Sequence, residues 1–157
     1  MSVNFSENEY MVYGRTVAFN FVLITNKSDI PTITIEASRV VRNNNKVSAS
    51  WDKKVAFQLE ADRELIQVAN LILTGSHESL EFKFHGVSKN KSLLIKNQED
   101  SLYLSLNDGS RRDPEDRNFS AKLPLYVVFH LKLLLVKAIS TRYKVDQNLV
   151  VNFLKGF

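Results

Sequence analysis

From residue 16 to residue 59, hydrophobic and polar residues alternate in the period-two pattern of half-buried β-strands. Residues 16–25 carry one apolar face, and residues 32–41 repeat the pattern after a cluster of turn-forming residues. Three consecutive asparagines then turn the chain, and residues 46–59 alternate again as one long strand. These stretches predict an antiparallel meander with one buried face and one face in water.

The hydrophobic period changes after residue 60. Apolar residues within 62–73 recur at the i, i+3, i+4 spacing of an amphipathic helix. Glu60 or Asp62 can accept hydrogen bonds from the free amides of its first turn, and Gly75 supplies a C-terminal stop. We therefore expect a helix over residues 62–73.

Strands resume after this helix and lead to a second one. The predicted strands are residues 80–85, 93–96, 101–107 and about 119–123. The second helix begins near Pro124, because proline is favoured at the first helical position, and runs to about Thr141. The order strands, helix, strands, helix predicts an α+β fold whose architecture repeats once.

Residues 91–106 combine a lysine-flanked strand, an acidic polar turn and an alternating strand. In the second strand the leucines take one face and Tyr103 takes the other. An open sheet face that offers an aromatic ring beside lysines suits single-stranded nucleic acid, because bases stack on the ring and phosphates meet the cations.

The second predicted helix is apolar on nearly every side over residues 125–139. A chain this small can rarely bury such a helix alone, which favours self-association with closed cyclic symmetry. The alternative is that the tail, residues 148–157, folds back over the helix. The residues expected at the subunit interface are Val128, Leu131, Leu134 and Leu135.

Composition bounds the class of protein. The chain has 157 residues, enough for one domain with a real core. Its net charge of +4 and pI of about 9.3 favour a polyanionic partner. The polar start resembles neither a signal nor a transit peptide, and the one long apolar run is interrupted by a histidine and two lysines. We expect a soluble, cytoplasmic protein without a membrane partner.

The sequence offers little for catalysis. There is no cysteine, and no histidine has a second ligand at metal-binding helical spacing. The glycines are scattered rather than gathered in a phosphate-binding loop. We expect neither enzymatic activity nor a cofactor or metal.

Four stretches, taken in order, resemble the Whirly family of single-stranded DNA-binding proteins. Residues 51–59 (WDKKVAFQL) are similar to that family's tryptophan–basic–basic strand, and residues 64–75 to its first helix with a leucine–x–glycine end. Residues 81–85 (EFKFH) are similar to its glutamate–phenylalanine–histidine strand. Residues 91–106 are similar to its lysine–serine–leucine strand and the tyrosine strand that follows.

This resemblance implies two four-stranded antiparallel sheets packed like pinwheel blades, with helices that assemble a homotetramer. It also implies that single-stranded DNA lies along the sheets with little sequence preference. It divides the chain into an N-terminal extension (residues 1–12), one Whirly-like domain (13–143) and a C-terminal tail (144–157).

The chain also departs from the plant members of that family. Where they carry lysine–glycine–lysine–alanine–alanine–leucine, residues 13–19 read YGRTVAF, without the first lysine. The transit peptide and the acidic, aromatic tail of plant members are missing as well. These differences favour a bacterial, phage or mobile-element relative that serves DNA metabolism.

The binding residues are expected among cations and aromatic rings on exposed strands. Trp51 shares its parity with Val55 and Phe57, which favours the core, but Lys53 has the same parity, so this face can also become exposed. Of Phe82 and Phe84, which share one face, we expect one in the core. Arginines in the polar loop 108–117 are solvated or reach the DNA. The candidate nucleic-acid-binding residues are Tyr13, Arg15, Trp51, Lys53, Lys54, Phe82, Lys83, His85, Lys89, Lys91, Lys96 and Tyr103.

The leading hypothesis is a homo-oligomeric, sequence-tolerant single-stranded DNA-binding protein that protects, anneals or organises exposed strands, for example in recombination or repair. A second hypothesis is an RNA-binding or annealing protein on the same fold. A third is an adaptor whose apolar helix recruits a partner, with nucleic-acid binding incidental.

Overall fold

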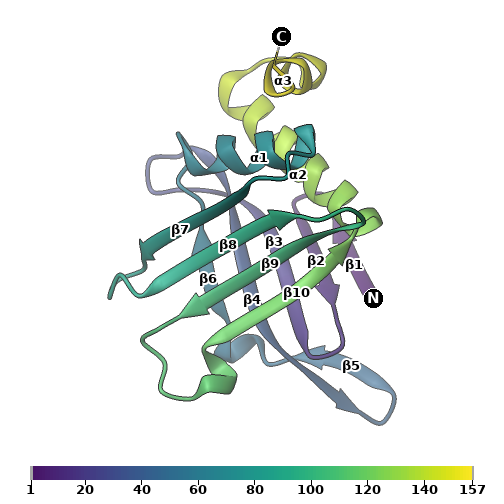
Figure 1. Cartoon of the computed structure of the whole chain (residues 1–157), viewed down its shortest axis with the longest axis vertical. Helices are drawn as coiled ribbons and strands as arrows, with labels where there is room; N and C mark the ends of the chain where they lie inside the picture. The colour runs from purple at the N-terminus through teal and green to yellow at the C-terminus, as the bar shows by residue number, and fades with distance from the viewer. Residues whose placement is uncertain (1, 157) are drawn as a thin grey trace.

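The computed structural model describes the backbone of residues 2–156 and the side chains of residues 7–156. The chain folds into two antiparallel sheets and three α-helices (Figure 1). The predicted α+β class with two antiparallel sheets is therefore confirmed, although the first sheet has six strands rather than four.

The first sheet has the strand order β1-β2-β3-β4, and the long strand β4 pairs on its other side with both β5 and β6. Two of these strands, β1 and β2, begin within the segment that was expected to be an extension. The strands are β1 (Ser2–Ser6), β2 (Glu9–Tyr13), β3 (Val17–Thr25), β4 (Pro31–Asn43), β5 (Lys46–Ala49) and β6 (Val55–Gln58).

Residues 46–59 do not form the single strand that was predicted. After β5 the chain enters a short 3-10 helix, η1 (Trp51–Lys53), in which the amide of Lys53 donates to the carbonyl of Ser50 at 2.9 Å. The chain then returns as β6 beside the earlier half of β4. Because η1 breaks the period-two pattern, parity along this segment does not decide the orientation of Trp51.

The second sheet has the order β10-β9-β8-β7 and is a simple meander. Its β9 shows the predicted alternation, with Leu102, Leu104 and Leu106 buried and Tyr103 on the opposite face. The strands are β7 (Ser79–His85), β8 (Lys91–Asn97), β9 (Ser101–Asp108) and β10 (Asn118–Pro124), and the β9–β10 loop contains a 3-10 turn, η2 (Pro114–Asp116).

Helix α1 (Glu64–Thr74) follows β6, helix α2 (Leu125–Tyr143) follows β10, and helix α3 (Gln147–Leu154) lies in the tail. The carboxylate of Glu60 accepts the amides of Asp62 and Arg63 at 2.8 Å each, and Gly75 ends α1 with a left-handed φ of +67°. No helix among the described residues is long and apolar enough to cross a membrane.

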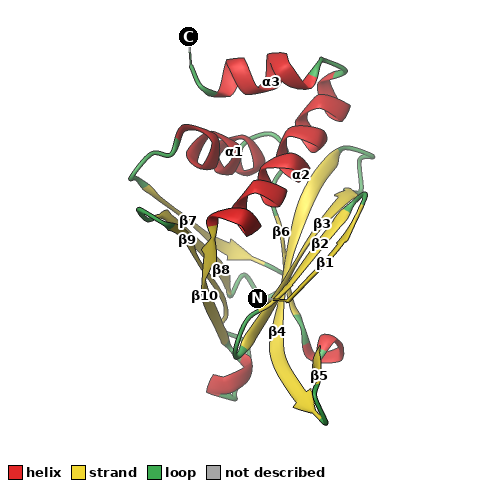
Figure 2. Ribbon diagram, turned by 90° about the vertical axis from the view of Figure 1, so that its right-hand side faces the viewer, coloured by secondary structure: helices red, strands yellow, loops and turns green. Residues whose placement is uncertain are grey.

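The two sheets form the arms of a V, with α1 and α2 in its wide end and α3 on top of them (Figure 2). Their inner faces and the helices enclose one core, which includes Phe19, Phe57, Leu65 and Leu104. The outer face of each sheet remains open. A flat binding surface is therefore available on either arm.

The residues predicted for a subunit interface on α2 prove to be core residues. Val128, Leu131, Leu134 and Leu135 are all at most 4% exposed, because α2 packs into the V and α3 covers its C-terminal half. The tail thus does fold back on the helix, as the alternative held. The large apolar side chains that α2 leaves exposed are Leu125, Tyr126, Phe129, Leu133 and, at its end, Tyr143.

Candidate nucleic-acid interface

The open face of the second sheet carries a row of two lysines with a tyrosine between them. Tyr103 on β9 lies opposite Lys96 on β8 and opposite Lys122 on β10. All three point away from the leucine-rich core face, and both lysines are exposed. Within residues 7–156, neither ammonium group has an ion-pair or hydrogen-bond partner. Their charges are therefore available to a ligand.

The rest of this face carries mainly serine and asparagine side chains, together with the half-buried Leu94 between Glu81 and Ser105. Ser105 and Ser120 form the neighbouring cross-strand pair, with their hydroxyl oxygens 3.2 Å apart. At the edge strand β7, Lys83 lies 3.5 Å from Glu81. The whole face thus presents three lysines against one carboxylate.

A second basic and aromatic cluster lies at one corner of the first sheet. The rings of Tyr13 and Trp51 meet edge to face, with their centroids 6.3 Å apart. Both side chains are half-buried, and Arg15, Lys53 and Lys54 around them are exposed. Because both rings are half-buried, a base could stack only on the part of each ring that is exposed to solvent.

The middle of the first sheet's open face is acidic. The side-chain amide of Asn20 donates to the carboxylate of Glu9 and, at 3.1 Å, to that of Glu36. Lys54 forms an ion pair with Glu36, so its charge is already compensated. This part of the surface does not attract a polyanion.

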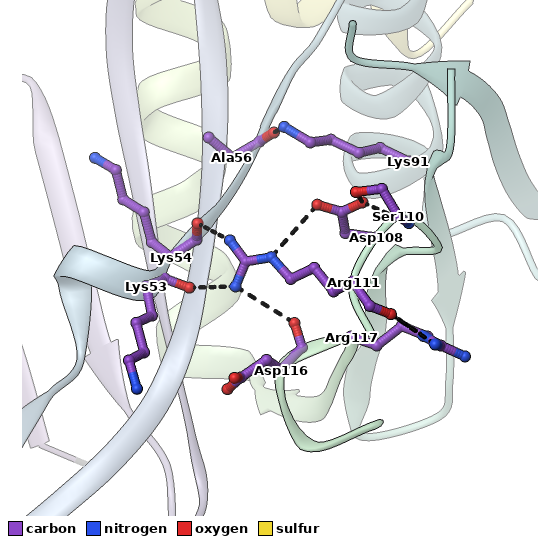
Figure 3. Close-up of polar contacts among 9 residues, drawn as sticks. All are labelled: Lys53, Lys54, Ala56, Lys91, Asp108, Ser110, Arg111, Asp116 and Arg117. Carbon is purple, nitrogen blue, oxygen red and sulfur yellow. Dashed lines mark hydrogen bonds and ion pairs between the residues drawn. The ribbon is translucent and has the colours of Figure 1, made fainter. Parts of the chain in front are cut away.

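The β9–β10 loop joins the second sheet to the first through Arg111. Its guanidinium donates to the carbonyl oxygens of Lys53 and Lys54 at 2.6 and 2.7 Å (Figure 3). Figure 3 also shows that the two lysine side chains extend away from this contact. Arg117 in turn donates to the carbonyl of Arg111 at 2.6 and 2.8 Å. Arg111 therefore links the two sheets, and Arg117 fixes the loop that carries it.

Asp108, at the end of β9, anchors the same junction. Burial alone would raise the pKa of its carboxyl group. Hydrogen bonds from the hydroxyl and amide of Ser110, at 2.6 and 3.1 Å, and the charges of Lys91 and Arg111 outweigh burial, so the pKa of Asp108 is lowered. Lys91 donates to the carbonyl of Ala56 at 2.9 Å and so also links the sheets.

The β7 strand departs from the alternation that the sequence predicts. Phe82 is buried at 8% exposure, whereas Phe84 is 75% exposed. A register shift between Phe82 and His85 places an extra residue in β7, and after this bulge the ring of His85 points inward. His85 Nε2 lies 2.8 Å from the carboxylate of Glu64, and the imidazole stacks on Phe57.

The structure therefore distributes the predicted residues over three places. The Tyr13–Trp51 corner holds Arg15, Lys53 and Lys54, the open face of the second sheet holds Lys83, Lys96 and Tyr103, and the exposed β7–β8 turn holds Lys89. Phe82, His85 and Lys91 have roles inside the fold instead. Phe82 is core, His85 is bonded to Glu64, and Lys91 is bonded to Ala56.

Sequence reasoning missed two exposed residues of this surface, Lys122 and Phe84. Lys122 could have been found, because Phe119 and Leu123 in β10 mark the inward face and leave Lys122 on the outward one. The exposure of Phe84 results from the bulge, for which the sequence carries no recognisable signal. Among residues 7–156, no three acidic, histidine or cysteine side chains are grouped to hold a metal ion.

Comparison with known proteins supports the fold. No protein-family model and no curated protein sequence matches the chain. Among solved structures, the chain is similar to WHY3 from Arabidopsis thaliana, a Whirly protein, with a TM-score of 0.60 and 13% identity over 99% of this chain and 98% of that one. It is also similar to WHY1 of the same plant, with a TM-score of 0.55 and 14% identity over 94% and 85% of the two chains. The chain therefore has a Whirly-like fold.

Proposed function

We propose that this chain is a sequence-tolerant single-stranded DNA-binding protein that binds DNA on the open face of its second sheet. The row Lys122–Tyr103–Lys96 carries the proposal. An aromatic ring between two unpaired cations meets the two needs of a single strand, stacking for its bases and positive charge for its phosphates. The Whirly-like fold supports this proposal further.

The geometry of the row explains why little sequence preference is expected. Neighbouring strands lie about 4.8 Å apart, so the two lysines flank Tyr103 at about equal distances. Every base has a π-face, and stacking on one ring is worth about 1–3 kcal/mol whatever the base. The described part of this face has no helix or β-ribbon shaped to enter a duplex groove.

Binding of a labelled oligonucleotide of about 30 nucleotides, followed by fluorescence anisotropy, tests the proposal, since such a strand exceeds the site size of most single-strand-binding domains. We expect tight binding at low salt that weakens with a logarithmic slope of about −0.7 for each phosphate contacted. Similar affinity for different base compositions is also expected. Absence of binding at low salt would overturn the proposal.

Competition with an RNA of the same sequence decides between DNA and RNA as the preferred ligand. Only RNA offers a 2′-hydroxyl group to the serine and asparagine side chains around Tyr103. We expect DNA to compete at least as well as RNA. Stronger competition by RNA would instead identify an RNA-binding or annealing protein.

We further propose that the protein acts as a homo-oligomer, with a tetramer favoured. Leu125, Phe129 and Leu133 recur every four residues, and with Tyr126 they form an apolar stripe on α2 that is 46–60% exposed. Such stripes mark association sites. A second copy of the chain is the proposed occupant, as the Whirly resemblance implies.

Light scattering combined with gel filtration tests the oligomer. Leu133→Asp is expected to reduce the mass of the assembly to that of smaller species, because a buried carboxylate would have no partner. Leu149→Asp on α3 is the matched control, since Leu149 is also about half exposed. An intact assembly in Leu133→Asp, or a monomeric wild-type protein, would contradict the proposal and favour a heterologous partner on this stripe.

Three expectations from the sequence stay predictions. They are a cytoplasmic location, a role in recombination or repair, and a bacterial, phage or mobile-element source.

A further inference from the structure

The tip of the β7–β8 hairpin displays an aromatic ring that the fold does not use. Phe84 is 75% exposed and has no ring contact within residues 7–156. Its backbone has a left-handed φ of +64°, which is an outlier for a bulky side chain. Residues in such conformations persist only where the surrounding structure imposes them, and they cluster at functional sites.

The bulge that exposes Phe84 is imposed by its neighbour. Between the pairs Phe82–Leu93 and His85–Lys91, β7 has two residues where β8 has one. The imidazole of His85 is held by the carboxylate of Glu64 at 2.8 Å and by Phe57, with ring centroids 4.0 Å apart. Because His85 is fixed inward at this register, the preceding residue must turn outward.

Lys91 packs closely against the backbone of the hairpin tip next to Phe84. Gly86 has a φ of +84°, and a Cβ atom there would stand 3.2 Å from the stem of Lys91. Lys91 is itself fixed by its bond to the carbonyl of Ala56. A backbone that is fixed before binding leaves only the Phe84 side chain to be ordered when a ligand stacks on it.

The surroundings of Phe84 suit a polyanion with apolar rings. Lys83 and Lys89 are exposed on either side of it in the sequence. The tip continues the edge strand of the sheet that carries Lys96 and Tyr103. Ser79 is the β7 residue opposite Lys96, so Phe84 lies five residues further along this edge than the row. A strand that runs diagonally from the row toward the hairpin tip would meet the Phe84 ring.

We propose that Phe84 is a base-stacking residue, which holds an unpaired nucleobase where a single strand crosses the β7 edge of the second sheet. This inference rests on the proposed function and adds a second stacking ring to Tyr103. It also gives a reason for the strained backbone at Phe84, since only the bulge brings a ring to this edge.

Replacement of Phe84 tests the inference through two measurements, the affinity for an oligonucleotide and the melting temperature of the protein. Phe84→Ala and Phe84→Gly are expected to weaken oligonucleotide binding about five- to one-hundredfold, the loss of one stacked base. Phe84→Gly should not lower the melting temperature, because glycine adopts a left-handed φ without strain. Phe84→Trp should retain the affinity. Val87→Ala, which removes a fully exposed apolar group from the same tip, should leave both quantities unchanged.

Photocrosslinking of the wild-type protein gives a test that needs no variant. An oligonucleotide containing 5-iododeoxyuridine is expected to crosslink to the tryptic peptide of residues 84–89. If the wild-type protein binds no oligonucleotide, the proposed function falls together with this inference. If it binds, but Phe84→Ala binds equally well and the crosslinks lie in other peptides, only the role of Phe84 is overturned.

Discussion

Both sheets are antiparallel and leave one face open, but the charges on the two open faces are opposite. On the first sheet, the middle of the face carries Glu9 and Glu36 around Asn20, and Lys54 forms an ion pair with Glu36. The open face of the second sheet carries three lysines, Lys83, Lys96 and Lys122, and one carboxylate, that of Glu81. A repeated fold therefore does not imply a repeated binding site, and we expect DNA to bind the two faces unequally.

The largest effect on DNA affinity is expected when the row Lys122–Tyr103–Lys96 is removed from the open face of the second sheet. The triple variant Lys96→Gln, Tyr103→Ala, Lys122→Gln removes one stacking ring and two phosphate contacts. We expect oligonucleotide affinity to fall about one hundredfold or more, and the salt slope to decrease by about 1.4. Fluorescence anisotropy over a salt series measures both.

A charge-matched variant gives the control for this experiment. Lys27→Gln with Lys155→Gln removes two exposed lysines that lie outside both faces. If this variant loses as much affinity as the triple variant, binding follows net charge alone and the comparison between the two faces has no functional meaning.

A smaller effect, on stability, is expected at the junction between the sheets. Arg111→Ala removes the two bonds from the guanidinium to the carbonyls of Lys53 and Lys54. We expect the free energy of unfolding to fall by about 1–2 kcal/mol, because charge-assisted bonds at a partly exposed site are lost. Urea denaturation measures this loss.

Arg112→Ala is the neighbouring control for the junction. Arg112 is exposed, and its guanidinium forms no hydrogen bond within residues 7–156. A change of less than about 0.5 kcal/mol is expected. Equal losses in the two variants would mean that Arg111 does not couple the sheets.

The free energy of unfolding should depend on pH through the carboxyl group of Asp108, which lies at the same junction between the sheets. Its lowered folded pKa means that it stabilises the fold above its ordinary pKa of 3.8, and that this contribution is lost as pH falls through the lower folded value. Asp108→Asn should therefore be less stable than the wild-type protein at neutral pH, and the difference should shrink in acid. Urea denaturation at several pH values measures this, with the exposed Asp52→Asn as the control. A difference independent of pH would contradict the role of the charge.

The sequence predicted most of the elements because the hydrophobic period is regular in most of them. In β9 the alternation of leucines with Tyr103 fixes both the strand and its outward ring, and the helical spacing and Gly75 locate α1 within two residues at its start. Extra elements such as β1 and α3 lie where short, mixed segments give weak patterns.

The candidate site was predicted less well, because side-chain orientation depends on local breaks in the period. The 3-10 turn at Trp51 and the bulge before His85 both shift parity, and neither has a sequence signature. The same limit applies to α2. Its apolar residues on all sides predict that it is covered, but only its packing against the sheets, α1 and α3 shows which of them this chain buries.

The smallest expected effect tests how near the bound strand comes to the acidic first face. Glu36→Gln removes one carboxylate from this face and frees Lys54 from its ion pair. If DNA passes within about 10 Å, the Debye length at 0.1 M salt, affinity should rise about twofold at low salt, and the gain should disappear at high salt. Anisotropy at two salt concentrations measures this, with the exposed Asp29→Asn in the β3–β4 turn as the control. An equal gain in both variants would show that Glu36 acts only through net charge. A gain in Glu36→Gln alone would place the strand near the Tyr13–Trp51 corner as well as on the second sheet.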